Sequence, residues 1–237
     1  MFGQNPVAKN ELHMAGDALT VVNGMPFYTI QGEGPHAGRP AMFLRLHGCP
    51  LRCYFCDTHF SSPTDPLMSV QQIVDLMTEL WPVTIAQKLA VITGGEPTRQ
   101  NLKPLIQELL ELGWWVQIET AGLFWQDIFA EDYVDIVVSP KSRTINHLIY
   151  DHAAAFKYII KAGEVDLTDG LPLTNTQVEG GPRMPLARPR PRAEVFLSPM
   201  DEGNEAANGL NRRAVAEIAM KHGYRAGLQL HKFMDLP

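Results

Sequence analysis

The chain lacks three features that would place it in large classes of protein. Its 237 residues contain no apolar run of the about 18 residues that cross a bilayer. Basic residues do not prevail, since 20 Lys and Arg face 26 Asp and Glu, so binding to a nucleic-acid backbone is not indicated. The opening "MFGQNPVAKNELHMAG" has no charged segment followed by an apolar one, as a secretory signal would. We therefore expect a cytoplasmic protein with neither a membrane nor a nucleic-acid partner.

Cysteine is also scarce, and its distribution is informative. The sequence has three cysteines, Cys49, Cys53 and Cys56, all within "RLHGCPLRCYFCDTH" (45–59). An odd number of thiols cannot all pair, and a cytoplasmic setting keeps them reduced. Three interpretations compete: buried free thiols, a zinc site completed by His47 or His59, or a [4Fe–4S] cluster held by three thiolates. The last would leave one iron open for chemistry.

Two hydrophobic periods alternate along the chain, whose 45% hydrophobic and 19% charged residues are typical of a globular protein. Short apolar runs predict buried strands at 41–46, 88–93, 115–120, 134–139, 156–160, 194–198 and 228–230. Helical patterns lie between them at 69–81, 101–113 and 204–223, the first opening with a capping-box spacing at Ser69 and Gln72. This alternation predicts an α/β fold with a parallel sheet. With fewer strands than the eight of a full barrel, we expect a partial (β/α) barrel of about six.

Reactive or small polar residues follow most of the predicted strands. Thr93, Glu119, Lys141 and Lys161 all fall at or just after a strand's carboxyl end. In parallel α/β folds these ends meet at one edge, where active sites form. Turn chemistry explains the glycines and prolines there, but it does not require these four side chains. The pattern therefore favours a site at this rim.

The spacing Cys-x3-Cys-x2-Cys, with Phe55 before the last cysteine, resembles the radical S-adenosylmethionine (SAM) superfamily. The resemblance implies a radical SAM-like partial barrel in which the open iron binds the amino and carboxylate groups of SAM. One electron from the cluster then cleaves SAM and releases a 5′-deoxyadenosyl radical. "TGGEP" (93–97) resembles the glycine-rich turn that holds the methionine amino group in this superfamily. The motif in this context strengthens the cluster interpretation.

A narrower resemblance rests on "YTIQGEGPHAGRPAMFLRLHGCPLRCYFCDTHFS" (28–61), "VITGGEP", "ETAG", "VSPK" and "LQLHKFMDLP". Together these segments resemble the 7-carboxy-7-deazaguanine synthases, from Met25 to Pro237. The likeness implies a lyase that converts 6-carboxy-5,6,7,8-tetrahydropterin to 7-carboxy-7-deazaguanine with loss of ammonia, in queuosine biosynthesis. It also implies Mg²⁺, SAM used as a regenerated cofactor, a flavodoxin-type or other one-electron donor, and a homodimer.

The resemblance assigns roles to individual residues. The cluster ligands it implies are Cys49, Cys53 and Cys56. The SAM contacts are Phe55, Cys56, Asp57, Gly95, Ser139, Pro140, Lys141, Ser198, Pro199, Met200 and Asp201. The pterin contacts are Ile30, Gln31, Gly32, Arg45, Thr93 and Pro237, the last through a terminal carboxylate. An arginine suits the substrate carboxylate, which it can bind with two parallel hydrogen bonds.

Three further assignments keep an alternative. Glu33 is the candidate for proton transfer, although a turn carboxylate beside Gly34 is the simpler interpretation. Thr58 matches the family's Mg²⁺ ligand and equally suits a hydrogen bond to its own loop. Asp57 is the less favoured Mg²⁺ ligand. His231 is expected near the substrate or in the core.

Some segments depart from the family pattern. Residues 1–24 are expected to form a flexible or loosely packed extension ahead of one domain at 25–237. Residues 168–192 hold five prolines and four arginines without an apolar period, which predicts an irregular insertion. His47 and Ser198 stand where other polar residues are expected. Two alternatives remain: an activating protein for glycyl-radical enzymes, and a non-catalytic zinc or iron–sulfur protein.

Overall fold

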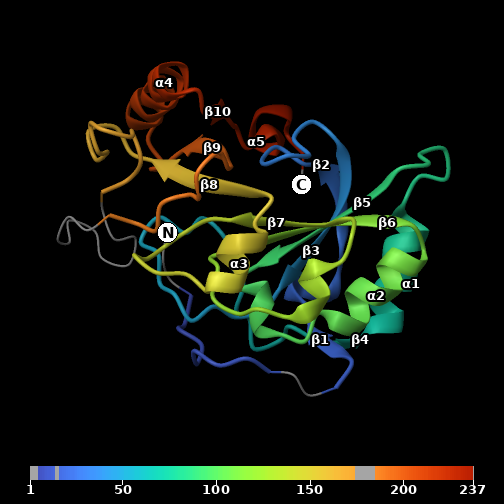
Figure 1. Ribbon diagram of the computed structural model, residues 1–237. Helices are drawn as coiled ribbons and strands as arrows, with labels where there is room; N and C mark the ends of the chain where they lie inside the picture. Colours follow the sequence, from blue (N-terminus) through green and yellow to red (C-terminus); the bar gives the residue numbers. More distant parts are fainter. Residues whose placement is uncertain (1–4, 14–15, 174–184, 237) are drawn as a thin grey trace.

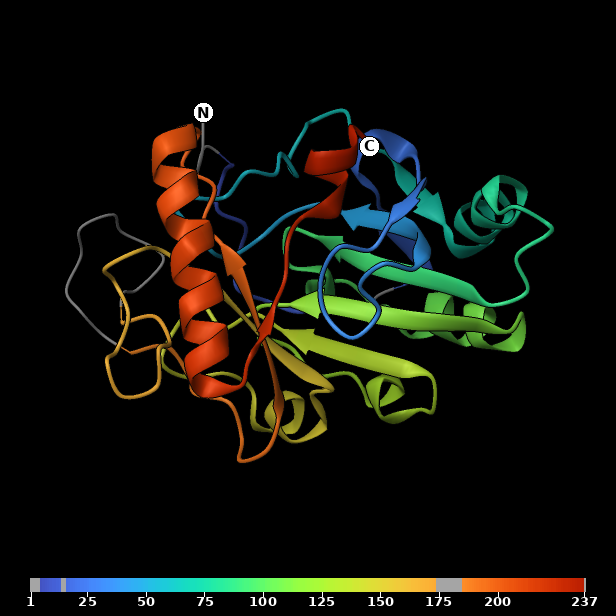
Figure 2. The ribbon, with the colours of Figure 1, turned by 90° about the horizontal axis from the view of Figure 1, so that it is seen from above.

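An eight-stranded sheet forms the centre of the molecule (Figures 1 and 2). The computed structural model describes residues 5–13, 16–173 and 185–236. The strands run in the order β10-β9-β8-β7-β6-β5-β3-β2, with β2 antiparallel to β3 and every other pair parallel. Their bounds are β2 Phe27–Ile30, β3 Pro40–Leu46, β5 Lys88–Gly94, β6 Trp114–Thr120, β7 Val134–Val138, β8 Ala155–Ile160, β9 Glu194–Pro199 and β10 Arg225–Ala226. The sheet is open, as a partial barrel requires.

Helices cover the sheet, as Figure 1 shows, with α1, α2 and α3 below it and α5 above it. The helices are α1 Val70–Leu80, α2 Lys103–Glu111, α3 His147–His152, α4 Glu205–His222 and α5 Leu230–Met234. Three 3₁₀ turns lie at η1 Val22–Gly24, η2 Pro97–Arg99 and η3 Asp127–Ala130. A separate two-stranded sheet pairs β1 Ala18–Thr20 with β4 Leu67–Ser69. None of the helices in the described part of the chain is long and apolar enough to span a bilayer.

The six strands predicted between residues 41 and 198 are confirmed and form the parallel part of the sheet. The strand predicted at 228–230 is wrong, since Leu230 begins α5. A Cβ built on Gly32 would lie 2.7 Å from the Leu228 oxygen, so this segment crosses the backbone of another loop and cannot extend the sheet. The edge position belongs to β10, whose two residues were too few to give a pattern.

The two faces of the strands differ in chemistry. Alternate residues, such as Met42, Leu44 and Leu46 on β3, point into the main hydrophobic core beneath the helices. The residues between them point to the opposite face, because side chains alternate along a strand. That face carries Arg45, Thr93, Glu119 and Ser198 near the carboxyl ends of four strands, and Lys157 in the middle of β8. Strand geometry therefore gathers polar groups on the side of the sheet away from the core beneath α1, α2 and α3.

Both departures from the family pattern have defined contacts. Residues 5–13 lie along the cysteine loop, to which Ala8 N donates a hydrogen bond at Cys49 O (2.8 Å). In the described parts of 168–192 the chain forms no helix and no named strand. Arg188 there pairs with Asp169 at 2.8 Å, so this arginine binds its own segment. Residues 174–184 lie outside the described part.

The predicted cap of α1 is present and gives a first test. Ser69 Oγ accepts from Gln72 N, and the Gln72 side chain accepts from Ser69 N at 2.9 Å. Ser69→Ala should lower the free energy of unfolding by about 1 kcal/mol, because the Gln72 amide at the helix start loses its side-chain acceptor. Urea unfolding measures this, with Ser142→Ala as the control, since that hydroxyl donates within an exposed loop. Equal stability of Ser69→Ala and wild type would contradict the assigned cap.

Candidate active site

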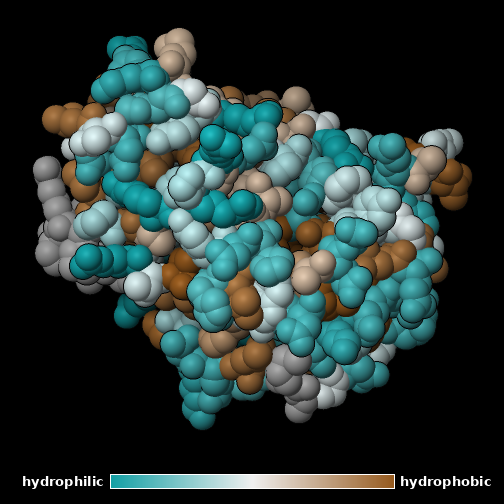
Figure 3. Space-filling model, viewed as in Figure 1, coloured by the Kyte–Doolittle hydropathy of each residue, from teal (hydrophilic) through white to brown (hydrophobic). Residues whose placement is uncertain are grey.

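A cavity of about 250 Å³ lies at the carboxyl ends of the parallel strands. Its wall combines the polar face of the sheet with the cysteine loop (residues 47–60), the loop after β2 and the segment at α5. On the face shown in Figure 3, polar side chains prevail and hydrophobic ones show at a hollow near the middle. Because the strands fix one wall and irregular loops form the rest, the architecture suits a binding site.

Most of the residues proposed from the sequence line this one cavity. They are Gln31, Gly32, Glu33, Arg45, Cys49, Cys53, Phe55, Cys56, Asp57, Thr58, Thr93, Gly95, Ser139, Lys141, Ser198, Pro199 and Asp201. Ile30, Pro140 and Met200 adjoin it without lining it. Lys161 does not reach the cavity either, because its amino group pairs with Glu164 (3.2 Å) and Glu202 (3.6 Å). Pro237 lies outside the described residues.

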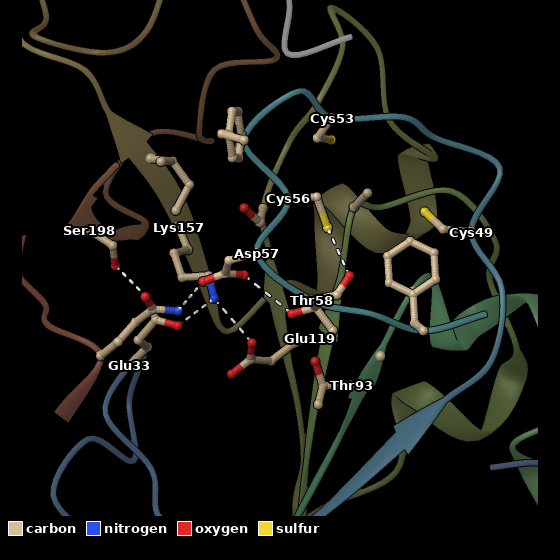
Figure 4. A pocket seen from close by; sticks show the side chains of 18 of the residues that line it. Glu33, Cys49, Cys53, Cys56, Asp57, Thr58, Thr93, Glu119, Lys157 and Ser198 are labelled. Atoms are coloured by element: carbon tan, nitrogen blue, oxygen red, sulfur yellow. Dashed lines mark hydrogen bonds and ion pairs between the residues drawn. The ribbon is translucent and has the colours of Figure 1, made fainter. Parts of the chain in front are cut away.

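The three thiols sit at one end of the cavity, on an irregular loop (Figure 4). Gly48 N donates to Phe60 O at 2.9 Å and closes the loop at its base. Cys49 packs against Phe60, and Leu51 N donates to its sulfur at 3.4 Å. Amide donors of this kind stabilise thiolate ligands of iron–sulfur clusters. Burial, with Glu96 nearby, raises the pKa of the Cys49 thiol to about 12, so a cationic metal centre must displace its proton.

The donor set fits a cluster better than a zinc ion. Within the described ranges, no three His, Cys, Asp or Glu side chains converge closely enough to hold one metal ion. His47, a possible zinc ligand, bonds Asp65 at 2.7 Å, and neither His47 nor His59 lines the cavity. Three thiols that face one cavity without a fourth protein ligand match a cluster with an open corner. The pattern of buried free thiols is not seen either, since Cys53 and Cys56 are partly exposed.

The turn after β5 needs both of its glycines. A Cβ built on Gly94 would lie 2.2 Å from Leu46 O, and one on Gly95 would lie 2.2 Å from Gly48 O. The turn thus packs directly on the start of the cysteine loop and presents a side-chain-free surface to the cavity. Buried Glu96 fixes the turn by accepting from Thr98 and Thr120 hydroxyls, each at 2.6 Å. Burial raises the pKa of Glu96.

A buried ion network forms the opposite end of the cavity (Figure 4). Lys157 Nζ lies 3.0 Å from both Glu33 Oε2 and Glu119 Oε2, and its side chain is 9% exposed. Ser198 Oγ donates to Glu33 at 2.6 Å, and Gln31 Nε2 donates to Glu119 at 2.8 Å. Burial alone would lower the pKa of Lys157, but the two carboxylates outweigh it and raise that pKa. Burial likewise opposes ionisation of Glu119, yet Lys157 leaves the pKa of Glu119 below its usual value.

The α5 segment closes one side of the site. Lys232 Nζ lies 2.8 Å from both Asp57 Oδ2 and Asp201 Oδ2, which joins the cysteine loop to the loop after β9. The hydrogen bond from Lys232 lowers the pKa of Asp201 to about 2. Gln229 and His231 line the cavity, so of the two positions considered for His231 the structure has the one at the site and not the one in the core. Burial lowers the pKa of His231.

Another lysine lies between the two ends of the cavity. Lys141 Nζ donates to Ser139 O at 2.9 Å and also contacts the Ser139 hydroxyl. Burial lowers the pKa of Lys141. Both residues lie just beyond β7, at the level of the cysteine loop, so they are placed to meet a ligand bound beside the thiols.

Lys157 is the main functional residue that sequence reasoning missed. Its neighbours Phe156, Tyr158 and Ile160 all face the main core. Strand alternation therefore places Lys157 on the cavity face, and a lysine in a buried strand needs a carboxylate partner. That signal was available in "FKYII". No sequence signal identified Asn5, which also lines the cavity.

Comparisons with known proteins agree with this geometry. Residues 44–147 match the Radical SAM superfamily. The 7-carboxy-7-deazaguanine synthase of Rhodospirillum rubrum is 40% identical over 243 residues, covering 100% of both chains. The synthase of that name from Rickettsia prowazekii is 34% identical, covering 100% of this chain and 96% of its own. The crystal structure of QueE from Escherichia coli superimposes with a TM-score of 0.62 at 20% identity, covering 90% of this chain and 94% of that one.

The open parallel sheet and the three-thiol loop define a radical SAM protein of the partial-barrel class. The full-length relatives then narrow the class. The chain belongs to the 7-carboxy-7-deazaguanine synthase family.

The ion network predicts a large effect of Lys157→Met. Two buried carboxylates, Glu33 and Glu119, would lose their cation, so the free energy of unfolding should fall by about 3–5 kcal/mol at pH 7. Chemical unfolding measures this. Lys161→Met is the matched control, because its partners are more exposed and its loss should cost less than about 1 kcal/mol.

The same variant should reverse one pH dependence. In wild type the lowered pKa of Glu119 contributes stability above about pH 4.3, which is lost as the pH falls. Without Lys157, burial raises that pKa, so the variant should become relatively more stable as the pH falls from 7 toward 5. If Lys157→Met lowered the free energy of unfolding no more than Lys161→Met does, or by an amount independent of pH, the assigned ion network would be contradicted.

Proposed function

We propose that the chain is a radical SAM lyase that converts 6-carboxy-5,6,7,8-tetrahydropterin to 7-carboxy-7-deazaguanine with loss of ammonia. One observation supports this most strongly: a single cavity has three thiols at one end and a buried ionic wall at the other. Ligands for a reactive centre and charged groups for a polar substrate therefore face the same space. The names of the full-length relatives agree with the reaction.

Cys49, Cys53 and Cys56 are proposed to hold the cluster, which when reduced supplies the electron for SAM cleavage. The neighbouring surface suits SAM. Gly95 offers backbone without a side chain, and Lys141 and Asp57 offer charges of both signs for an amino acid carboxylate and amine. Phe55, Cys56, Ser139 and residues 198–201 complete the proposed contacts, although Pro140 and Met200 could act only through the shape of their loops.

The far wall is proposed to hold the pterin. Arg45 lies over the ring of Phe27, with its guanidinium carbon 5.6 Å from the centroid, and faces the cavity from β3. It is suited to the substrate carboxylate. Gln31, Gly32 and Thr93 supply polar edges for the ring, while Ile30 could support them only from β2. Pro237 remains a proposed contact from the family resemblance.

Glu33 is proposed to transfer a proton at the substrate amine that leaves as ammonia. The carboxylate is fixed by Lys157 Nζ and Ser198 Oγ, so it cannot swing away from the cavity without leaving both partners. Residues positioned this firmly reduce the reorganisation that a proton transfer requires. Ser198, proposed above as a SAM contact, donates to Glu33 at 2.6 Å and so also supports this carboxylate.

Thr58 is the proposed protein ligand of Mg²⁺. Its hydroxyl lines the cavity and donates to Asp57 Oδ1 at 3.3 Å, a weak contact that a cation can replace. Mg²⁺ commonly binds one or two protein oxygens and takes the rest from substrate and water. Asp57 is the less suitable ligand, because its other oxygen already pairs with Lys232.

The reaction class requires an electron donor, and we propose a flavodoxin-type protein for this role. We further propose a homodimer. Both rest on the family resemblance, and size measurement in solution tests the second.

The proposed reaction has a direct assay. Anaerobically reconstituted protein incubated with carboxytetrahydropterin, SAM, Mg²⁺ and reductant should yield the deazapurine, detected by mass spectrometry. Cys53→Ala should form none, because two thiolates do not retain the cluster. Lys221→Met, on the exposed side of α4, is the control. If SAM were cleaved but no deazapurine formed, the proposed substrate would be wrong, while the assignment to the radical SAM class would stand.

Arg45 tests the pterin wall separately. Arg45→Met should raise the KM for carboxytetrahydropterin about 10- to 100-fold, because a charged pair of hydrogen bonds is lost, and should leave the KM for SAM nearly unchanged. Arg225→Met is the matched control: its guanidinium also lies 5.6 Å from a ring, that of Phe196, but it is exposed at the sheet edge. Equal KM values for the two variants would remove Arg45 from the substrate site.

A further inference from the structure

Residues 5–13, which we call the N-terminal strap, lie against the cysteine loop and are joined to its first ligand. Val7 forms a parallel β-bridge with Cys49, and Ala8 N donates to Cys49 O at 2.8 Å. A Cβ built on Gly48 would lie 3.6 Å from Ala8 Cβ, so the strap passes directly beside the loop's first turn. The strap is therefore packed on the backbone that carries Cys49.

Asn5 connects the strap to the other end of the loop. Its Nδ2 donates to Thr58 O at 2.7 Å, and its Oδ1 accepts from Phe60 N at 2.9 Å and from Ser61 Oγ at 3.2 Å. Phe60 packs on Cys49 and closes the loop through Gly48. One side chain thus holds the limb that follows Cys56.

The strap is itself anchored near the glycine turn. Arg99, at the end of η2, is 6% exposed and donates to Lys9 O at 3.1 Å. Its carbonyl accepts from His13 N at 2.7 Å. Because η2 follows the turn that packs on Gly48, the strap, the glycine turn and the cysteine loop form one connected unit.

The donor of Asn5 matters most once Cys56 is a ligand. In the protein as described, the Cys56 thiol donates to Thr58 O at 3.7 Å. A coordinated thiolate has no proton to donate, so this carbonyl then depends on Asn5 Nδ2. An unpaired carbonyl beside the cluster would favour rearrangement of the limb and entry of water.

We infer that Asn5 is a positioning residue for the cluster. Its hydrogen bonds fix residues 56–60 of the cysteine loop against the strap, and this helps the protein to retain the cluster and to exclude water from it. This inference rests on the proposed function, since it requires that Cys49, Cys53 and Cys56 bind a cluster. It assigns residues ahead of Met25 to the active site. The strap also supplies cavity wall, because Asn5 lines the space in front of the thiols.

The experiment compares Asn5→Ala, Asn5→Asp and Asn146→Ala in the full chain after anaerobic reconstitution. Asn146 is the control, since it caps α3 through backbone amides away from the cavity. The readouts are iron and sulfide per chain and the rate at which the visible cluster absorption bleaches in air. Asn5→Ala should bleach about 5- to 30-fold faster than wild type, because the three hydrogen bonds of the Asn5 side chain to residues 58–61 are lost. Unfolding of each cluster-free variant reports whether the fold is intact.

Asn5→Asp separates the donor from a general structural role. The aspartate can still accept from Phe60 N and Ser61 Oγ but cannot donate to Thr58 O. It should therefore bleach nearly as fast as Asn5→Ala. Wild-type bleaching in Asn5→Asp would overturn the assigned donor, and equal bleaching of Asn5→Ala and Asn146→Ala would overturn the inference. A wild-type protein that takes up no cluster would instead refute the proposed function.

Discussion

The ion pairs of Lys157 with Glu33 and Glu119 are the interaction on which the cavity wall depends. A cavity lined by a parallel sheet needs polar groups to bind a polar substrate, yet each buried charge costs several kcal/mol unless paired. One cation between two carboxylates, with hydrogen bonds from Gln31 and Ser198, satisfies both requirements. The network also joins the loop after β2 to β6, β8 and β9. The contacts that offset the free-energy cost of burying these charges therefore also fix the position of the proposed pterin site.

The thiol end of the cavity is formed by a loop and not by strands. The cysteine loop has no helix or strand of its own between residues 47 and 60. Its shape depends on contacts from outside: the glycine turn at its base, Phe60 against Cys49, and the links at Asp57 and Thr58. An irregular loop can present thiols at separations that a helix or strand does not offer, but only if neighbouring elements hold it. Gly94 and Gly95 pack so closely on Leu46 and Gly48 that neither position has room for a side chain.

Sequence reasoning succeeded where a local pattern determines the structure. Six strands and three helices followed from hydrophobic period, and the cap at Ser69 followed from spacing. It failed at 228–230, where three residues are too few to show a period and the backbone of Gly32 decides the path. Composition also gave no sign of the contacts made by residues 5–13, because these are single hydrogen bonds to distant residues. Contacts such as Asn5 to Thr58, 53 positions apart, leave no periodic trace.

Segments near both ends of the described chain meet at two consecutive residues of the cysteine loop. Lys232 of α5 binds the Asp57 side chain, and Asn5 of the strap binds the Thr58 carbonyl. The cysteine loop has no helix or strand of its own, so its Asp57 carboxylate and Thr58 carbonyl need partners from other segments. Asn5 and Lys232 supply these partners, and the same contacts hold the strap and α5 against the loop. The conformation of the proposed cluster site therefore depends on contacts from outside residues 44–147, the range that matches the Radical SAM superfamily.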